Sequence, residues 1–285
     1  MCRFTLYLGP PVLLSSILLE PSHSLIRQSV QSHERSEPLN GDGFGIGWYA
    51  PEFSEEPAVF RSITPAWNNR NLHNLARVVS SNCILAHVRA ATQSSGVNDA
   101  NCHPFRYKNF LCMHNGDIGN FRKVRRRVLE SVCDEAYSNV YGSTDSEHFF
   151  AVVIDELLKH EVRAAKDLVS ALDSAITRIN HIVETYGDGE PSYLNVAIAD
   201  GKQAVVSRYT NDPESEPETL YYFTGKLYEY SDPDQPACEE IVVSSERLTN
   251  DAGWQIVPAN HLVIFNPGLP PQLVPCGETG KKRAA

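Results

Sequence analysis

The order of predicted helices and strands is the feature that most limits how this chain can fold. Two amphipathic helices follow one another in the middle of the sequence, the first opened by the capping-box pattern at residues 144–147 and the second at residues 164–186. Gly187 is predicted to end the second helix in a left-handed conformation. Short strands are predicted on either side, at residues 44–49, 83–88, 110–113, 194–199, 204–209, 220–224, 240–244, 255–257 and 262–265. Helices grouped between strands favour an α+β fold over an alternating parallel one.

Length and composition predict one globular domain without a membrane segment. The 285 residues are 42% hydrophobic, enough for one substantial core, and we expect the domain to span residues 2–266 with a loosely ordered tail at 267–285. A net charge of -10 argues against nucleic acid and anionic membranes as partners. No run approaches the roughly 20 apolar residues that span a bilayer. Seven scattered cysteines, an odd number, fit the cytoplasm better than a disulfide-bonded secreted protein.

Cys2 is the sharpest candidate for a catalytic group. Removal of Met1 would leave a thiol and a free α-amino group on the same residue. An α-amine has an ordinary pKa of about 7.7 to 8, so it can take the thiol proton and later return one to a leaving group. Position alone favours the alternative, a buried cysteine without chemistry.

The segment His114-Asn115-Gly116 follows a predicted apolar strand. An amide side chain and an unhindered backbone N–H at the end of a strand can hold a tetrahedral oxyanion. The alternative is that Asn115-Gly116 forms a hairpin turn, the commonest meaning of this dipeptide. The two interpretations are about equally supported by the segment alone.

Three charged or polar side chains are candidates for substrate binding. Arg89 ends a predicted strand and can hold a carboxylate bidentately, with Thr92 assisting. Asp145 lies in the first turn of a capped helix and can bind an ammonium group. The alternatives are a structural ion pair for Arg89 and a favourable interaction with the helix dipole for Asp145.

Several other patterns narrow the possible functions. Glycines at every second position of residues 41–47 leave one strand face bare for close approach of a backbone or ligand, but the segment lacks the dinucleotide-binding pattern. Cysteines and histidines at residues 87, 102, 103, 112 and 114 lack the paired spacing of a zinc site, so we expect neither metal nor cofactor. The basic stretch Arg122 to Arg127 is interpreted as a solvated helix face, with a partner contact as the minor possibility.

The motifs taken in order resemble those of the class II glutamine amidotransferases. They are Met1-Cys2-Arg3-Phe4, Asn40-Gly41-Asp42-Gly43, Ala86-His87-Val88-Arg89, Asn101-Cys102-His103-Pro104-Phe105, His114-Asn115-Gly116 and Ser143-Thr144-Asp145-Ser146-Glu147. The resemblance implies a four-layer αββα sandwich of the N-terminal-nucleophile hydrolase type, with the nucleophile at the start of a central strand. Several members carry Trp after the arginine and His after the threonine, where this chain has Ala90 and Gln93, so we expect the pocket rim to differ.

The resemblance also implies a role for each candidate residue. Cys2 would be the nucleophile with its own α-amine as base, and Asn115 and Gly116 would form the oxyanion hole. Arg89 and Asp145 would bind the α-carboxylate and α-ammonium of a γ-glutamyl substrate.

Within the family, residues 63–69, 101–105 and 142–147 resemble the amidotransferase-like subunits of the fungal alternative glutathione-degradation pathway. Such subunits cleave the γ-glutamyl-cysteine bond of glutathione together with a larger peptidase-like partner that carries WD repeats. This implies a similar substrate and partner here. The alternatives are a glutaminase, acting alone or feeding ammonia to a separate partner, and an inactive scaffold subunit.

Overall fold

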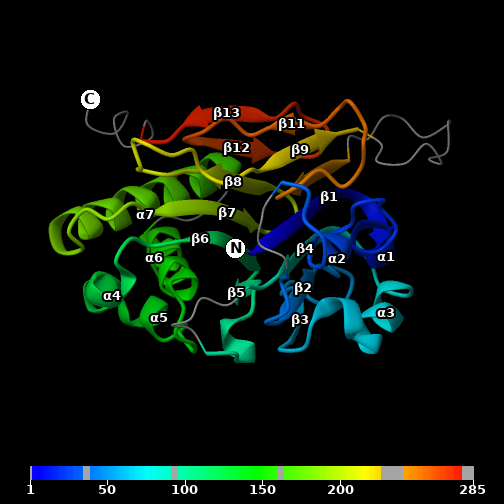
Figure 1. Ribbon diagram of the computed structural model, residues 1–285, viewed down its shortest axis with the longest axis horizontal. Coiled ribbons are helices and arrows are strands. Elements are labelled where there is room, and N and C mark those ends of the chain that lie inside the picture. The colour runs from blue at the N-terminus through cyan, green and yellow to red at the C-terminus, as the bar shows by residue number, and fades with distance from the viewer. Residues whose placement is uncertain (1, 35–38, 91–95, 160–163, 226–239, 278–285) are drawn as a thin grey trace.

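The computed structural model describes residues 2–34, 39–90, 96–159, 164–225 and 240–277 (Figure 1). The helices in these residues are α1 (Leu14–Leu18), α2 (Leu25–Gln28), α3 (Arg70–Ala76), α4 (Phe121–Glu130), α5 (Asp134–Tyr137), α6 (Asp145–Lys159) and α7 (Ala165–Tyr186). The strands are β1 (Arg3–Leu13), β2 (Phe44–Trp48), β3 (Ala58–Ser62), β4 (Ser80–Val88), β5 (Phe105–Tyr107), β6 (Phe110–Asp117), β7 (Tyr193–Ala199), β8 (Ala204–Arg208), β9 (Tyr221–Thr224), β10 (Ile241–Ser244), β11 (Gln255–Ile256), β12 (His261–Phe265) and β13 (Gln272–Pro275). The two central helices and each of the predicted strands are confirmed, to within a few residues at their ends.

The described strands form two antiparallel sheets. One has the order β11-β9-β10-β1-β4-β2-β3 and the other β13-β12-β8-β7-β6-β5. β1 is central in the first sheet, where Thr5 pairs with Ser244 of β10 and Arg3 pairs with Val88 of β4. The residue before β1 therefore lies beside the residue that follows β4.

Three apolar cores separate four layers, so the predicted αββα sandwich is confirmed. Alternate residues of β1, including Phe4 and Leu6, join Met113 and Val206 of the second sheet in a core between the sheets. Tyr7 faces the other way and packs with residues of α1, α2 and α3, while α6 and α7 pack on the outer face of the second sheet. Figure 1 shows α1 to α3 on one side of the molecule and α4, α6 and α7 on the other.

The start of α6 corrects one detail of the predicted capping box. Thr144 does accept a hydrogen bond at Oγ1 from the Glu147 N–H, at 3.3 Å. The Glu147 carboxylate was expected to reach back to the first residue of the box, but it accepts the backbone N–H groups of Tyr141 and Gly142 instead, at 2.8 and 2.5 Å. Glu147 therefore orders the loop that leads into the helix.

Two further expectations differ from the structure. Gly187 follows α7 with a φ of -107°, and the left-handed residues come next, Asp188 at 60° and Gly189 at 69°. The tail was expected to be loosely ordered, but residues 272–275 form β13. This strand pairs with β12, with Leu262 opposite Val274. An edge strand this short carries little periodicity of its own, and its order depends on the neighbouring strand.

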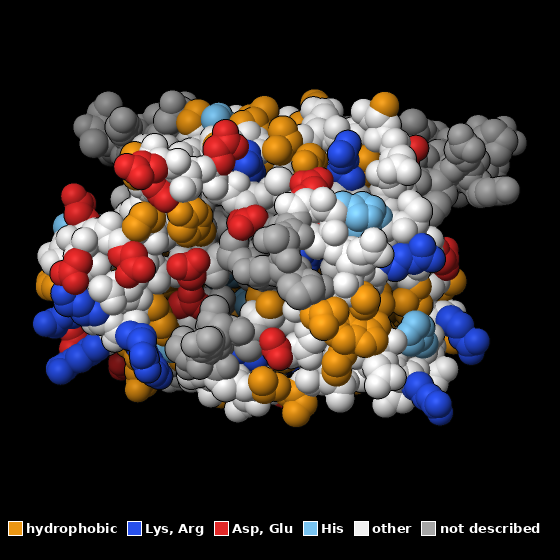
Figure 2. Space-filling view, viewed as in Figure 1, with side chains coloured by type: hydrophobic (Ala, Val, Ile, Leu, Met, Phe, Trp, Pro, Cys, Tyr) orange, Lys and Arg blue, Asp and Glu red, His pale blue; other side chains and the backbone are white. Residues whose placement is uncertain are grey.

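The basic stretch is confirmed as an exposed helix face. α4 buries Val124 and Val128 while its arginines and lysine lie at the surface, and Figure 2 shows blue side chains grouped at the left of the molecule near this helix. Glu130 pairs with Arg126 and Arg127 at 2.6 and 2.8 Å.

In the part of the chain that the model describes, no helix has the length and apolar character needed to cross a membrane.

Candidate active site

Four separate elements bring the candidate residues to one cavity. Cys2 precedes β1, Arg89 follows β4, Asn115 and Gly116 lie in β6, and Asp145 begins α6. The cavity is lined by Cys2, Arg89, Ala90, Asn101, His103, Asn115, Gly116, Asp117, Thr144, Asp145 and Ser146. Thr92 and Gln93 lie outside the described residues. Every described residue predicted for the site thus lines the same cavity.

The Cys2 thiol is half-buried at the cavity wall. Its Sγ donates to the Ala90 carbonyl at 3.5 Å. Burial raises the pKa of the thiol above its ordinary value, and the positive charge of Arg89 opposes this only in part. A thiol in this state needs a base to become a nucleophile at neutral pH.

Asn115 and Gly116 are held inside a strand, so the hairpin-turn alternative is wrong. Asn115 pairs with Asn195 and Gly116 with Leu194 in the β6–β7 ladder. The Asn115 side chain is 1% exposed, and neither its amide nitrogen nor its oxygen has a hydrogen-bond partner. Gly116 has a φ of 151°, and a Cβ there would lie 1.8 Å from the Tyr193 carbonyl oxygen, so only glycine fits. An unsatisfied buried amide is costly, and it is available to a ligand in the cavity.

The two charged candidates occupy different walls of the cavity. Arg89 is 3% exposed, and its guanidinium donates to the Gly96 carbonyl at 3.3 and 3.4 Å. Asp145 accepts the Ile118 N–H at 3.0 Å and the Ser146 N–H at 2.8 Å. These backbone bonds fix the carboxylate while it remains partly exposed. A cation and an anion fixed on one cavity suit a zwitterionic ligand.

Several cavity residues were not predicted as site residues, although they flank predicted ones. Asn101 and His103 belong to the Asn-Cys-His-Pro-Phe motif, and Thr144 and Ser146 to the helix start. Asp117 follows Gly116, and partial burial with the nearby charges of Asp145 and Glu190 raises the pKa of its carboxyl group to about 6. Their signal was membership of that motif for Asn101 and His103 and adjacency to a candidate for the others, and neither reveals which way a side chain points.

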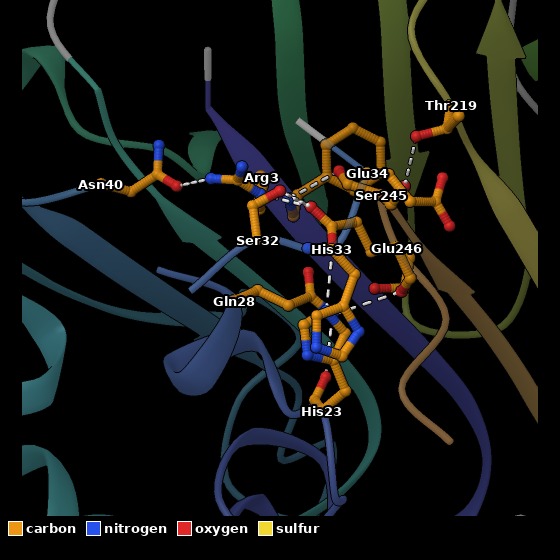
Figure 3. A network of polar contacts seen from close by, with 12 residues as sticks. Arg3, His23, Gln28, Ser32, His33, Glu34, Asn40, Thr219, Ser245 and Glu246 are labelled. Carbon is orange, nitrogen blue, oxygen red and sulfur yellow. Dashed lines mark hydrogen bonds and ion pairs between the residues drawn. The ribbon is translucent and has the colours of Figure 1, made fainter. Parts of the chain in front are cut away.

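A buried polar network fixes the start of β1, the strand that follows Cys2 (Figure 3). Arg3 donates to Glu246 Oε1 at 2.9 Å and also to the Asn40 side chain. Glu246 further accepts from Ser32 Oγ at 2.6 Å and from the His33 N–H at 2.9 Å. The side chains of Arg3 and Glu246 are both 1% exposed. Because Arg3 adjoins Cys2, this network sets the position of the thiol.

Metal-binding and disulfide chemistry have no structural support within the described ranges. There, no group of three or more His, Cys, Asp or Glu side chains is arranged to hold a metal ion. The six cysteines that the model describes are free thiols, and Cys238 lies outside the described residues.

Comparison with known proteins shows which family the chain belongs to. The family model described as glutamine amidotransferases class-II matches residues 19–284. A Saccharomyces cerevisiae protein named "Probable glutamine amidotransferase DUG3" is 37% identical over 93% of this chain and 82% of its own length. The chain belongs to the class II glutamine amidotransferases. A further relative in this comparison, "Gamma-glutamyl-hercynylcysteine sulfoxide hydrolase" of Mycobacterium tuberculosis, is 28% identical over 92% of each chain.

Solved structures share the same fold. A glutamine aminotransferase class-II domain protein from Silicibacter pomeroyi has a TM-score of 0.68 and 25% identity, covering 96% of this chain and 99% of its own. Glutamine phosphoribosylpyrophosphate amidotransferase from B. subtilis has a TM-score of 0.60 and 14% identity. The match covers 97% of this chain and 49% of the B. subtilis chain. This class II amidotransferase thus has the family's sandwich across nearly its whole length.

Proposed function

We propose that this class II amidotransferase hydrolyses γ-glutamyl amide bonds with Cys2 as its nucleophile, once Met1 has been removed. The observation that carries the proposal is the single cavity lined by a thiol, an unpartnered buried amide, a buried guanidinium and a fixed carboxylate. These are the groups needed to attack an amide, to hold its oxyanion and to bind an amino-acid head group.

The substrate's head group is bound by its two charges. Arg89 holds the α-carboxylate, with Thr92 assisting, and Asp145 holds the α-ammonium. Both interactions are shared by every γ-glutamyl compound. They therefore select the head group and leave the identity of the leaving group open.

The reaction proceeds through a thioester. The α-amine of Cys2 takes the thiol proton, and the thiolate attacks the γ-carbonyl while the Asn115 side chain and the Gly116 N–H hold the oxyanion. The C–N bond breaks as the α-ammonium gives its proton to the leaving amine. Water, deprotonated by the same amine, then attacks the thioester, releasing glutamate and restoring the thiol. The raised thiol pKa makes the nearby amine necessary at neutral pH.

Replacing Asn115 with alanine is expected to lower kcat by about 10²- to 10³-fold, because one oxyanion donor is lost. KM should change much less, since the oxyanion exists only in the transition state. Steady-state kinetics on a γ-glutamyl substrate measure both. Asn180→Ala is a matched control on α7, remote from the cavity, and should retain the parent kcat. An Asn115→Ala enzyme with the parent kcat would remove this residue from the mechanism.

For the substrate, we propose the γ-glutamyl-cysteine bond of glutathione, cleaved in a complex with a larger peptidase-like subunit carrying WD repeats. Support comes from the motif resemblance of residues 101–105 and 142–147. It also comes from the M. tuberculosis relative, whose name gives it a γ-glutamyl conjugate of a cysteine derivative as substrate. Such a bond offers the same head group with a sulfur-containing leaving group.

Glutamine and glutathione compared as substrates test this choice. The purified chain is assayed for glutamate release from each, alone and after co-expression with a WD-repeat peptidase subunit. We expect glutathione to give the higher kcat/KM, with a further increase in the complex. Preference for glutamine, with ammonia as co-product, would indicate the glutaminase alternative. No turnover of either compound by a chain that keeps Met1 would indicate an inactive scaffold.

A further inference from the structure

His103 lines the candidate active-site cavity without an assigned role. His103 is 3% exposed, and neither of its imidazole nitrogens has a hydrogen-bond partner. A neutral imidazole carries one hydrogen-bond donor and one acceptor, and burying both without partners is costly. Asn115 is the other lining residue with this property.

The other buried polar side chains on the cavity wall have hydrogen-bond partners within the protein. Asn101 accepts the Ser143 N–H at 2.9 Å, and Thr144 accepts the Glu147 N–H. Ser146 Oγ lies 2.9 Å from His114 Nδ1. The criterion that singles out Asn115 as a group awaiting a ligand therefore singles out His103 as well.

The bare glycine face of β2 holds His103 at the cavity. A Cβ on Gly45 would lie 2.1 Å from the His103 carbonyl oxygen, and one on Gly47 would lie 2.9 Å from a Pro104 ring carbon. The segment that contains His103 thus packs directly on this strand, which confirms the predicted close approach. No residue larger than glycine fits at Gly45 without moving His103.

Aromatic rings fix the orientation of the imidazole. The His103 ring centroid is 4.2 Å from that of His87 and 4.3 Å from that of Phe105. Burial holds the pKa of His103 well below its usual range, and the neighbouring His87 and His114 act in the same direction. His103 is therefore neutral at physiological pH, suited to hydrogen bonding and unsuited to act as a base.

We propose that His103 is a further substrate-binding residue, whose neutral imidazole N–H donates to an oxygen of the γ-glutamyl substrate bound beside Cys2. This inference rests on the proposed function, because it takes its ligand to be the γ-glutamyl compound. It gives the Asn-Cys-His-Pro-Phe motif a direct role in recognition, in addition to Arg89 and Asp145.

The test measures binding in a Cys2→Ala parent, so that turnover does not interfere. Dissociation constants for glutamine and glutathione are measured by calorimetry for the parent and for His103→Leu, His103→Asn and His103→Gln. His103→Leu is expected to weaken binding by about tenfold or more, since a hydrogen bond to the ligand is lost. The Asn and Gln amide nitrogens lie near the positions of Nδ1 and Nε2, so the variant that matches the donating nitrogen should recover most of the affinity and the other should show the same loss.

His181→Leu is the control, because it removes an exposed imidazole on α7 that does not line the cavity. It should bind within about threefold of the parent, a change too small for the loss of a hydrogen bond. Around neutral pH, the ratio of parent to His103→Leu dissociation constants should stay constant, because burial lowers the pKa of His103 well below its usual range.

The outcomes separate this inference from the proposed function. A Cys2→Ala parent that binds neither compound contradicts the proposed function. A parent that binds, with His103→Leu folded by thermal unfolding and binding equally well, overturns only the role of His103. Equal losses in His181→Leu and His103→Leu would likewise overturn it, because the loss would not be specific to the cavity.

Discussion

Replacing Cys2 with alanine is expected to abolish γ-glutamyl hydrolysis, with kcat falling by about 10⁴-fold or more, as for other catalytic nucleophiles. The thiol is the proposed nucleophile, and no second cysteine lines the cavity among the described residues. The measurement is glutamate release by the parent and the variant at saturating substrate. Binding of the substrate should persist, because Arg89 and Asp145 are unchanged.

Cys133→Ala is the matched control for this result. Cys133 is an exposed thiol next to α5 and lies outside the cavity. It should retain the activity of the parent. Hydrolysis that survived in Cys2→Ala and was lost in Cys133→Ala would place the chemistry elsewhere.

Replacing Glu246 with alanine is expected to lower the free energy of unfolding by about 3 to 5 kcal/mol, the usual cost of leaving a buried charge without its partner. Arg3 would lose its partner at 2.9 Å while remaining buried, and the His33 N–H and Ser32 hydroxyl would lose theirs. Urea unfolding followed by tryptophan fluorescence measures the change. Because Arg3 adjoins Cys2, kcat should fall as well.

The pH dependence of stability gives a second signature of Glu246. Burial alone would raise its pKa, but hydrogen bonds from His23, Ser32, the His33 N–H and Arg3 hold the pKa well below its usual range. A lowered carboxyl pKa adds stability above the unfolded-state pKa of about 4.3, and this stability is lost as pH falls toward the folded-state value. The difference between parent and Glu246→Ala should therefore shrink in acid.

Glu130→Ala is the control for these measurements. Glu130 forms ion pairs with Arg126 and Arg127 on the exposed face of α4, where water and salt screen the charges. Its loss should leave the unfolding curve nearly unchanged. A Glu246→Ala variant as stable as Glu130→Ala would contradict the structural role of the network.

The fold was predictable where the sequence carries periodicity. The amphipathic pattern of α7 and the apolar runs of β4 and β7 are local signals, and the structure confirms all three. β1 was not predicted from local pattern, because Pro10 and Pro11 lie within it. Its central place depends on pairing with β4 and β10, which lie far away in the sequence.

The residues of the site could largely be predicted from the sequence, but their geometry could not. Cys2, Arg89, Asn115 and Asp145 each had an ordinary structural alternative, and only their order in the chain argued for chemistry. The contact between Arg3 and Glu246 spans 243 residues, and no local pattern points to it. The unpartnered state of His103 likewise emerges only once every neighbouring donor and acceptor is placed.

Mass spectrometry of the enzyme quenched in acid during turnover of glutathione or glutamine tests directly whether Cys2 is the nucleophile. We expect a chain that begins at Cys2 and an N-terminal peptide carrying one glutamyl group on the Cys2 sulfur, absent from Cys2→Ala. An active chain that retains Met1, or a glutamyl group attached to any other residue, would contradict this role of Cys2.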